Sequence, residues 1–290
     1  MEPSLYQIGP FVMRVTNLPK AWHDHVQASF ASADDNTTDA PLHLHLRTEG
    51  APDRGDGSGF LVNMQHIRVE RDQERWTIFH EEAFTAHYSP DTNRIDLDVR
   101  HNQDAPRVIL DNTLRGVVAT MLPLRFHGLM LHASSGLLNH HGIFFAGLST
   151  AGKTTMAEGM KRAQFLSDDI SLVRDLSTTP ELMASPFYGA LGRRGADASG
   201  PLRAVVLLEK DPSETRITPV DPRQAVMELL RHVVCFSKDS VLSDAILTRV
   251  TQLVERVPVF RVARFIETAS DDICQQVLDL AAADPRFQPK

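Results

Sequence analysis

The chain has 290 residues, of which 42% are hydrophobic and 23% are charged, and its formal net charge is -7. This length is enough for two domains or one large domain, while the acidic balance, with acids and bases interspersed, gives no broad basic surface for nucleic acid. No stretch approaches the roughly 20 apolar residues that cross a bilayer, so we expect neither nucleic acid nor a membrane as a partner.

Cysteine use and the start of the sequence bear on the cellular location. The two cysteines, Cys235 and Cys274, lie far apart in the sequence, which does not fit a disulfide framework. Residues 1–6 have neither the basic segment nor the apolar core of a secretory leader. Both features favour a reduced, cytoplasmic setting.

The first part of the chain, residues 1–104, is predicted to form a β-rich domain. Short apolar segments, several of them alternating with polar residues, are separated there by turn-forming residues. Such spacing is typical of an antiparallel meander or a small sandwich. The predicted strands cover residues 11–15, 42–46, 60–64, 67–70, 76–79, 84–88 and 95–99.

A helix is predicted next, over residues 105–126, because apolar residues recur there at three- and four-residue spacing. We expect this segment, residues 105–127, to connect the β-rich domain to a third part, residues 128–290. The third part begins with an apolar strand that carries His132, and a turn is predicted at 136–141.

One stretch carries a specific chemical signal. Gly147 to Thr154 reads Gly-Leu-Ser-Thr-Ala-Gly-Lys-Thr and matches G-x-x-x-x-G-K-[ST] without a gap. An apolar run at 142–146 precedes it and a helix-forming stretch at 155–162 follows, so strand, glycine turn and helix occur in the order that a phosphate cradle requires. The residues predicted to contact a nucleotide are Gly147, Ser149, Ala151, Gly152, Lys153, Thr154 and Thr155.

Each residue type in this loop has a physical reason. Gly147 and Gly152 allow backbone turns that a Cβ would forbid, so that main-chain N–H groups and the positive end of the helix dipole surround a phosphate. Lys153 adds a cation for the outer phosphates, and the hydroxyl of Thr154 is the usual ligand for Mg²⁺. The cofactors predicted from this stretch are ATP and Mg²⁺.

Two adjacent carboxylates, Asp168 and Asp169, interrupt an apolar run at 165–173. In a strand their side chains point to opposite faces, so one can hold the metal ion while the other addresses the acceptor of the phosphoryl group. The alternative interpretation is a solvated turn that happens to carry two acids.

The rest of the chain is predicted to alternate between helices and strands. Arg193 and Arg194 lie in a glycine-containing segment, which is interpreted either as a lid or phosphate clamp or as a plain exposed loop. The predicted strands and helices that follow cover residues 202–210, 222–234, 241–256, 259–265 and 270–282.

Three of these motifs together resemble the catalytic core of the HPr kinase/phosphorylase family, whose fold is similar to that of phosphoenolpyruvate carboxykinase. They are Leu131-His132-Ala133, Gly147 to Thr154 and Ser167-Asp168-Asp169. The resemblance covers about residues 128–265. It implies an α/β fold with a P-loop nucleotide-binding domain of this type, preceded by the β-rich N-terminal region.

The resemblance also implies a function. Family members move the γ-phosphoryl of a nucleotide to a serine hydroxyl of a small carrier protein. Carried over to this chain, Asp168 is the general base, Asp169 and Thr154 hold Mg²⁺, Lys153 neutralises the transferring charge and His132 positions Asp168. The acceptor is expected to be a serine in a protein or peptide. Relatives are often oligomeric, so the resemblance is compatible with a homo-oligomer and leaves the oligomeric state open. The family's long signature loop, which is associated with the reverse, phosphorylase reaction and with oligomer contacts, is replaced here by residues 190–195. The β-rich N-terminal region also differs from the family's usual regulatory domain, and both departures point to a different acceptor.

Three other functions are compatible with the same motifs. A carboxykinase-like enzyme would phosphorylate a small-molecule alcohol and would need an anion clamp, for which Arg193, Arg194 and Arg203 are candidates. A P-loop ATPase would use Glu209, at the end of an apolar strand, to polarise water. A nucleotide sensor would bind without turnover.

Overall fold

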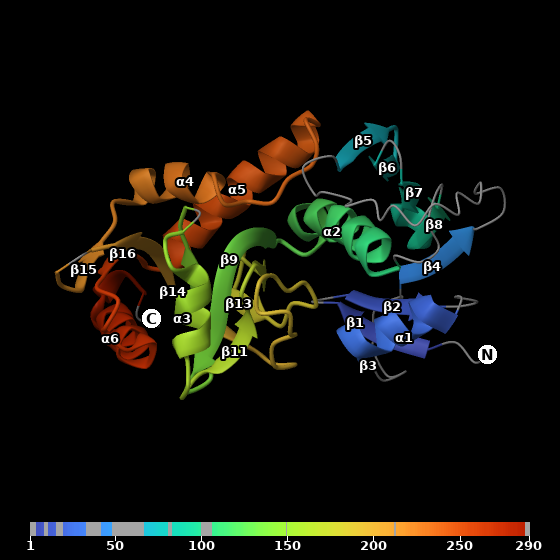
Figure 1. Ribbon diagram of the computed structural model, residues 1–290. Helices are drawn as coiled ribbons and strands as arrows, with labels where there is room; N and C mark the ends of the chain where they lie inside the picture. The colour runs from blue at the N-terminus through green and yellow to red at the C-terminus, as the bar shows by residue number, and fades with distance from the viewer. Residues whose placement is uncertain are drawn as a thin grey trace. The chain divides into compact units, whose positions relative to one another are not determined.

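The computed structural model describes most of the chain (Figure 1). The chain folds into two compact units. The first unit comprises Met1–Met121 and Cys235–Ser243, and the second comprises Leu122–Val234 and Asp244–Lys290. The described residues are 4–8, 11–15, 20–32, 42–47, 67–80, 83–99, 106–148, 150–211 and 213–287.

The first unit contains one eight-stranded sheet, in the order β3-β1-β2-β4-β8-β7-β6-β5. Its last four strands form the antiparallel meander that the sequence predicts, whereas β4 pairs in parallel with both β2 and β8. All eight described strands belong to this sheet, so the predicted sandwich is not what the described residues form. The strands are β1 (Ser4–Ile8), β2 (Phe11–Val15), β3 (Ala31–Ser32), β4 (Leu42–Arg47), β5 (Arg68–Asp72), β6 (Arg75–His80), β7 (Phe84–Ser89) and β8 (Arg94–Val99).

Side-chain alternation explains this sheet. In β6, β7 and β8 every second residue is buried, as expected for strands with one face on a core. Helix α2 (Pro106–Arg125) begins in this unit, and a Cβ on its Gly116 would lie 2.4 Å from Cγ2 of Ile78 in β6. The helix backbone therefore packs directly on the sheet. Helix α1 (Lys20–Ser29), β1 and β3 were not predicted, and the predicted strand at 60–64 lies outside the described residues.

The second unit is built on another eight-stranded sheet. The main path runs β10-β9-β12-β13-β14-β16-β15, with β11 paired to β9. Strand β10 also pairs with β14, so β10, β9, β12, β13 and β14 form a closed circuit. The strands are β9 (Leu129–Leu138), β10 (His141–Ala146), β11 (Gln164–Ser167), β12 (Ile170–Arg174), β13 (Glu181–Met183), β14 (Ser199–Lys210), β15 (Arg216–Pro219) and β16 (Val259–Arg264). The protein is thus a mixed α/β structure with two sheets.

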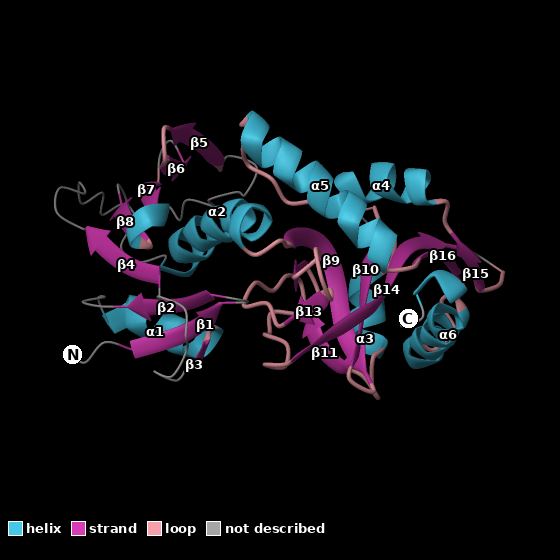
Figure 2. Ribbon diagram, turned by 180° about the vertical axis from the view of Figure 1, so that it is seen from behind, coloured by secondary structure: helices cyan, strands magenta, loops and turns pink. Residues whose placement is uncertain are grey.

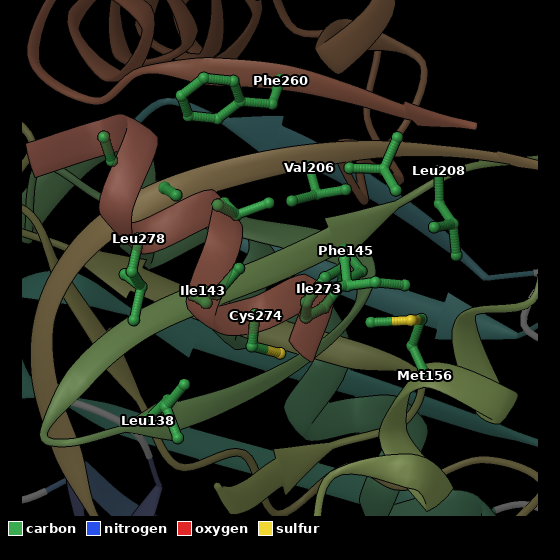
Figure 3. Close-up of a cluster of buried hydrophobic side chains, with 14 of the residues drawn as sticks. Leu138, Ile143, Phe145, Met156, Val206, Leu208, Phe260, Ile273, Cys274 and Leu278 are labelled. Atoms are coloured by element: carbon green, nitrogen blue, oxygen red, sulfur yellow. The ribbon is translucent and has the colours of Figure 1, made fainter. Parts of the chain in front are cut away.

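Helices cover this sheet on both faces, as Figures 1 and 2 show. Helices α3 (Lys153–Gly159) and α6 (Ser270–Ala283) lie on one face. Helix α4 (Pro222–Leu230) and the part of α5 (Ser240–Arg256) from Asp244 onward lie on the other. Between the sheet and helices α3 and α6 is a buried apolar cluster, shown in Figure 3, to which Phe145, Val206 and Ile273 belong.

Several boundaries in this unit differ from the prediction. Strand β9 continues to Leu138, and the turn is confined to Asn139 and His140, which have φ angles of 50° and 64°. Helix α4 ends at Leu230, because Val233 pairs with Leu131 of β9 instead of continuing the helix. Strands β13 and β15 were not predicted. No helix among the described residues is both long enough and apolar enough to span a bilayer.

Candidate functional site

Strand directions bring the predicted motifs to one edge of the second sheet. Strands β10, β14 and β16 are parallel, so their carboxyl ends meet at that edge, and the glycine loop follows β10 directly. Strand β9 is antiparallel to β10 and places His132 beside the last residues of β10. The bend at Asp168 and Asp169 lies next to His132, because Ile170 is the register partner of that histidine.

Two glycines of the predicted loop lie at backbone positions that a larger residue would strain. A Cβ on Gly147 would lie 2.7 Å from the carbonyl oxygen of Leu208 and 2.9 Å from Cβ of Ala151. Gly152 has a φ of 101°, a conformation that L side chains rarely adopt. Helix α3 starts immediately afterwards, with the N–H of Met156 donating to the carbonyl of Gly152 at 2.8 Å. Ser149, predicted to contact the nucleotide, lies outside the described residues.

Lys153 folds back over this loop. Its Nζ donates to the carbonyl oxygens of Gly147 at 2.8 Å and Leu148 at 3.3 Å, and the side chain is buried. Burial lowers the pKa of Lys153 from its ordinary value, and the nearby Asp169 carboxylate opposes part of that shift. The ammonium group is therefore held against the loop by two neutral carbonyl acceptors.

The two aspartates occupy a bend between two strands, not positions within one strand. Strands β11 and β12 both pair with β9, one on each side of the bend. The hydroxyl oxygen of Ser167 fixes the bend by accepting the N–H groups of Asp169 and Ile170, at 3.3 and 3.1 Å. The different surroundings of the two acids arise from this bend and not from strand alternation.

Asp168 is 3% exposed and is tied to the following segment. Its Oδ1 accepts the N–H of Gly189 and its Oδ2 accepts the N–H of Leu191, both at 2.8 Å. These bonds hold the carboxylate in one orientation at the wall of the site. They also make the position of residues 189–191 depend on Asp168.

Asp169, and not Asp168, is the partner of His132. Nδ1 of His132 lies 3.0 Å from Oδ1 of Asp169. The main chain fixes this pair, because Ala133 N–H donates to the carbonyl of Asp169 at 2.9 Å and His132 N–H donates to the carbonyl of His232 at 2.7 Å. The resemblance assigned His132 to positioning Asp168, and this part of the assignment does not match the geometry.

One cavity of about 700 Å³ joins these groups. It is lined by all the residues that the sequence indicates as catalytic or metal-binding, and by three further predicted residues of the loop. The predicted residues that line it are His132, Ala151, Gly152, Lys153, Thr154, Thr155, Asp168 and Asp169.

The three arginines predicted to contact a substrate do not line this cavity. The guanidinium of Arg193 lies over the ring of Phe165, with Cζ 5.2 Å from the centroid, and Arg194 pairs with Asp197 at 2.8 Å. Arg203 is exposed near the start of β14, seven residues before Lys210 and so about 23 Å from the site along the strand. The predicted anion clamp is therefore not formed by these residues.

Sequence reasoning missed residues at the far side of the loop. Lys210, Asp211, Arg264 and Ile266 line the cavity from the ends of β14 and β16. The sequence indicated these residues indirectly, because residues at the carboxyl ends of parallel strands gather at one edge of a sheet. Predicting their place in the site required the order of the strands. His232 was also missed, and burial, followed by the charges of Lys153 and His132, lowers its pKa.

Glu209, the residue required by the ATPase interpretation, faces a different cavity. Residues alternate along β14, so Leu208 joins the apolar cluster while Glu209 points to the opposite face. There it pairs with Arg261, which also pairs with Glu228 of α4 at 2.6 Å. Glu209 does not line the cavity that contains Lys153 and Asp169.

The residues present fit a nucleotide and Mg²⁺. The nearest atom to a Cβ on Gly152 would be Cδ2 of Leu208 at 3.8 Å, so the loop is open at this glycine, and Thr154 and Asp169 bring a hydroxyl and a carboxylate to one cavity. Within the described part of the chain no cluster of three His, Cys, Asp or Glu side chains could hold a metal. Two protein ligands suit Mg²⁺, which usually binds through one or two side chains together with substrate phosphates.

Comparisons with known proteins give limited similarity. No family model matches the chain, and no curated protein matches it. Among solved structures it is similar to the Hpr(Ser) kinase/phosphatase from Coxiella burnetii, with 13% sequence identity over 42% of this chain and 87% of that chain. The TM-score is 0.25. This neighbour bears the name of the family that the sequence resembles.

Proposed function

We propose that this chain is a phosphotransferase that moves the γ-phosphoryl group of ATP to a hydroxyl group. One observation carries the proposal: a single cavity is lined by the cradle residues Lys153 and Thr154 and by the acids Asp168 and Asp169. A cation for phosphates and carboxylates for a metal and an acceptor are the parts that phosphoryl transfer requires.

Phosphate binding is assigned to the loop and the start of α3. Main-chain N–H groups at a helix start favour an anion, and Nζ of Lys153 can exchange the carbonyl of Gly147 for a phosphate oxygen. Thr154 and Asp169 are assigned to Mg²⁺, which neutralises charge on the phosphates when bound. His132 orients the Asp169 carboxylate through the contact at Nδ1.

Asp168 is assigned to the acceptor. Its carboxylate is held by the N–H groups of Gly189 and Leu191, so it keeps a fixed direction at the cavity wall. A loose transition state demands little basicity from the group that accepts the hydroxyl proton, and orientation supplies more of the rate. The acceptor is proposed to be a serine of a protein or peptide, and a small-molecule alcohol is the alternative.

No observation favours the other interpretations. The small-molecule carboxykinase interpretation relied on Arg193, Arg194 and Arg203, which do not line the cavity. The ATPase interpretation relied on Glu209, whose carboxylate is paired with Arg261 in the second cavity.

Two substitutions separate the kinase from the ATPase. With purified protein, Mg²⁺, ATP and candidate acceptors, we expect Asp168→Asn to lower phosphoryl transfer by about a hundredfold or more, because the hydroxyl proton loses its acceptor. Glu209→Gln should keep wild-type transfer. Acceptor phosphorylation is followed by mass spectrometry. A fully active Asp168→Asn protein, or turnover lost in Glu209→Gln alone, would contradict the proposal.

The hydrogen bonds from Gly189 and Leu191 to Asp168 lead to a further expected result. A Cβ on Gly189 would lie 2.7 Å from Cβ of Asp169 and 3.3 Å from Oδ2 of Asp168. We expect Gly189→Ala to lower the transfer rate about tenfold to a hundredfold, since small misplacements of reacting groups cost that much. The measurement is the rate at saturating ATP, together with the thermal unfolding midpoint.

A matched glycine three residues away serves as the control. Gly192 has a φ of 62°, and a Cβ added to it would have no atom within 4 Å. Asparagine tolerates this backbone region. Gly192→Asn is therefore expected to leave the rate unchanged. Equal rates for Gly189→Ala and the wild type would show that the position of Asp168 and Asp169 does not limit transfer.

A further inference from the structure

Arg264 lines the cavity but does not belong to the phosphate loop. It is the last residue of β16, and because side chains alternate along a strand, it shares a face with Phe260 and Val262 of the apolar cluster. Its side chain is 9% exposed and lines the cavity. An arginine thus stands where the pattern of the strand calls for a hydrophobic residue.

The surrounding protein satisfies this guanidinium only in part. Nη2 donates to the carbonyl of Thr268 at 3.2 Å and to Oγ of Ser270 at 3.4 Å, while Nε is buried without a partner. Arg264 has no ion pair with a carboxylate among the described residues. Burial lowers the pKa of Arg264 from its ordinary value. A buried cation without an anion destabilises the fold, so an anion that enters the cavity gains a favourable partner.

Strand order places Arg264 across the loop from the aspartates. In hydrogen-bonding order the strands run β12, β9, β10, β14 and β16. His132 lies on β9, the loop follows β10, and Arg264 ends β16. Three strand spacings separate β9 from β16, which is about 14 Å. An extended ligand with one end at His132 and Asp169 therefore crosses the loop before its other end reaches Arg264.

We propose that Arg264 forms a second anion subsite, which binds the α-phosphate of the donor. This phosphate is bonded to the nucleoside and is not transferred. The inference rests on the proposed function, because that function puts the transferred phosphate beside Asp169. Lys210, the register partner of Arg264, adds a second positive charge, and the exposed Ile266 gives the same end of the cavity an apolar surface for the nucleoside. Pyrophosphate occupies the loop alone and does not reach Arg264. The subsite therefore implies that the donor is a nucleoside triphosphate and not pyrophosphate.

Titration calorimetry with ADP and with pyrophosphate, each with Mg²⁺, tests this subsite. We expect Arg264→Gln to weaken ADP binding about tenfold to a hundredfold, the effect of one lost hydrogen bond to a charged group, and to change pyrophosphate binding less than about twofold. Lys153→Gln should weaken both ligands. Arg286→Ala is the control, since Arg286 pairs with Asp284 and lines neither cavity.

The outcomes separate this inference from the function on which it rests. A wild-type protein that binds neither ligand would overturn both. Normal wild-type binding with unchanged ADP affinity in Arg264→Gln, or with equal losses for ADP and pyrophosphate, would overturn the subsite alone. If Arg264→Gln unfolds, Arg264→Lys replaces it: lysine lacks the fork that reaches a phosphate and Thr268 together, so weaker ADP binding is expected, and wild-type affinity would overturn the subsite.

Discussion

Replacement of Lys153 by methionine is expected to lower phosphoryl transfer by about a thousandfold, with ADP binding also weakened. The side chain is buried against the loop, and no other cation within the described part of the site donates to the carbonyls of Gly147 and Leu148. Losing one well-placed donor in a site that excludes water costs a factor of about a hundred to a thousand in rate. The measurement is the initial rate of acceptor phosphorylation at saturating ATP.

Lys161 provides the matched control for this substitution. It follows α3, it is exposed, and it lines neither cavity. Lys161→Met should therefore keep the wild-type rate. A Lys153→Met protein that is as active as Lys161→Met would show that the loop does not bind the donor.

Phe145→Ala is expected to destabilise the protein by about 3–5 kcal/mol, the usual cost of truncating a buried aromatic side chain. Phe145 is fully buried in the cluster between β10, β14 and helices α3 and α6 (Figure 3). The cavity left behind would lie directly beneath the strand that positions the loop. Urea unfolding, followed by circular dichroism, gives the change in the free energy of unfolding.

The control for Phe145 is a neighbouring apolar residue that is not buried. Leu148 is 73% exposed, so Leu148→Ala should change the free energy of unfolding by less than about 0.5 kcal/mol. A loss below about 1 kcal/mol for Phe145→Ala would mean that the cluster does not support β10 as described.

The parts of the site that depend on local sequence could be predicted. The loop conformation follows from glycines at fixed positions, and the apolar run before it forms β10, as its composition indicates. The helix after it was placed two residues late, because α3 begins at Lys153 itself. It also ends early, at Gly159, since Met160 leaves the helical region with a ψ of 89°.

The parts that depend on strand order could not be predicted. The bend at Asp168 arises because β11 and β12 both pair with β9, and no local pattern shows which acid then meets His132. Arg264 looks in sequence like the polar end of an apolar strand, and its role in the cavity appears only when β16 is placed next to β14. Arg193 and Arg194 occur in a motif that suggests anion binding, yet stacking on Phe165 and pairing with Asp197 hold them elsewhere.

In the first unit, too, several strands could be predicted from the sequence but their order could not. Short alternating segments predicted the strands β6, β7 and β8, since period-two alternation is a local signal. The parallel pairings of β4 with β2 and β8 join segments that are distant in sequence. A pattern of short alternating segments therefore favours a meander or a sandwich over the mixed sheet that is formed.

A crystal structure of the protein with ADP and Mg²⁺ tests the central claim most directly. The account predicts that the β-phosphate lies against the main-chain N–H groups at the start of α3, that Nζ of Lys153 has exchanged the carbonyl of Gly147 for a phosphate oxygen, and that the metal ion lies between Thr154 and Asp169. Nucleotide bound away from Lys153, or Asp168 and Asp169 both turned from the phosphates, would contradict it.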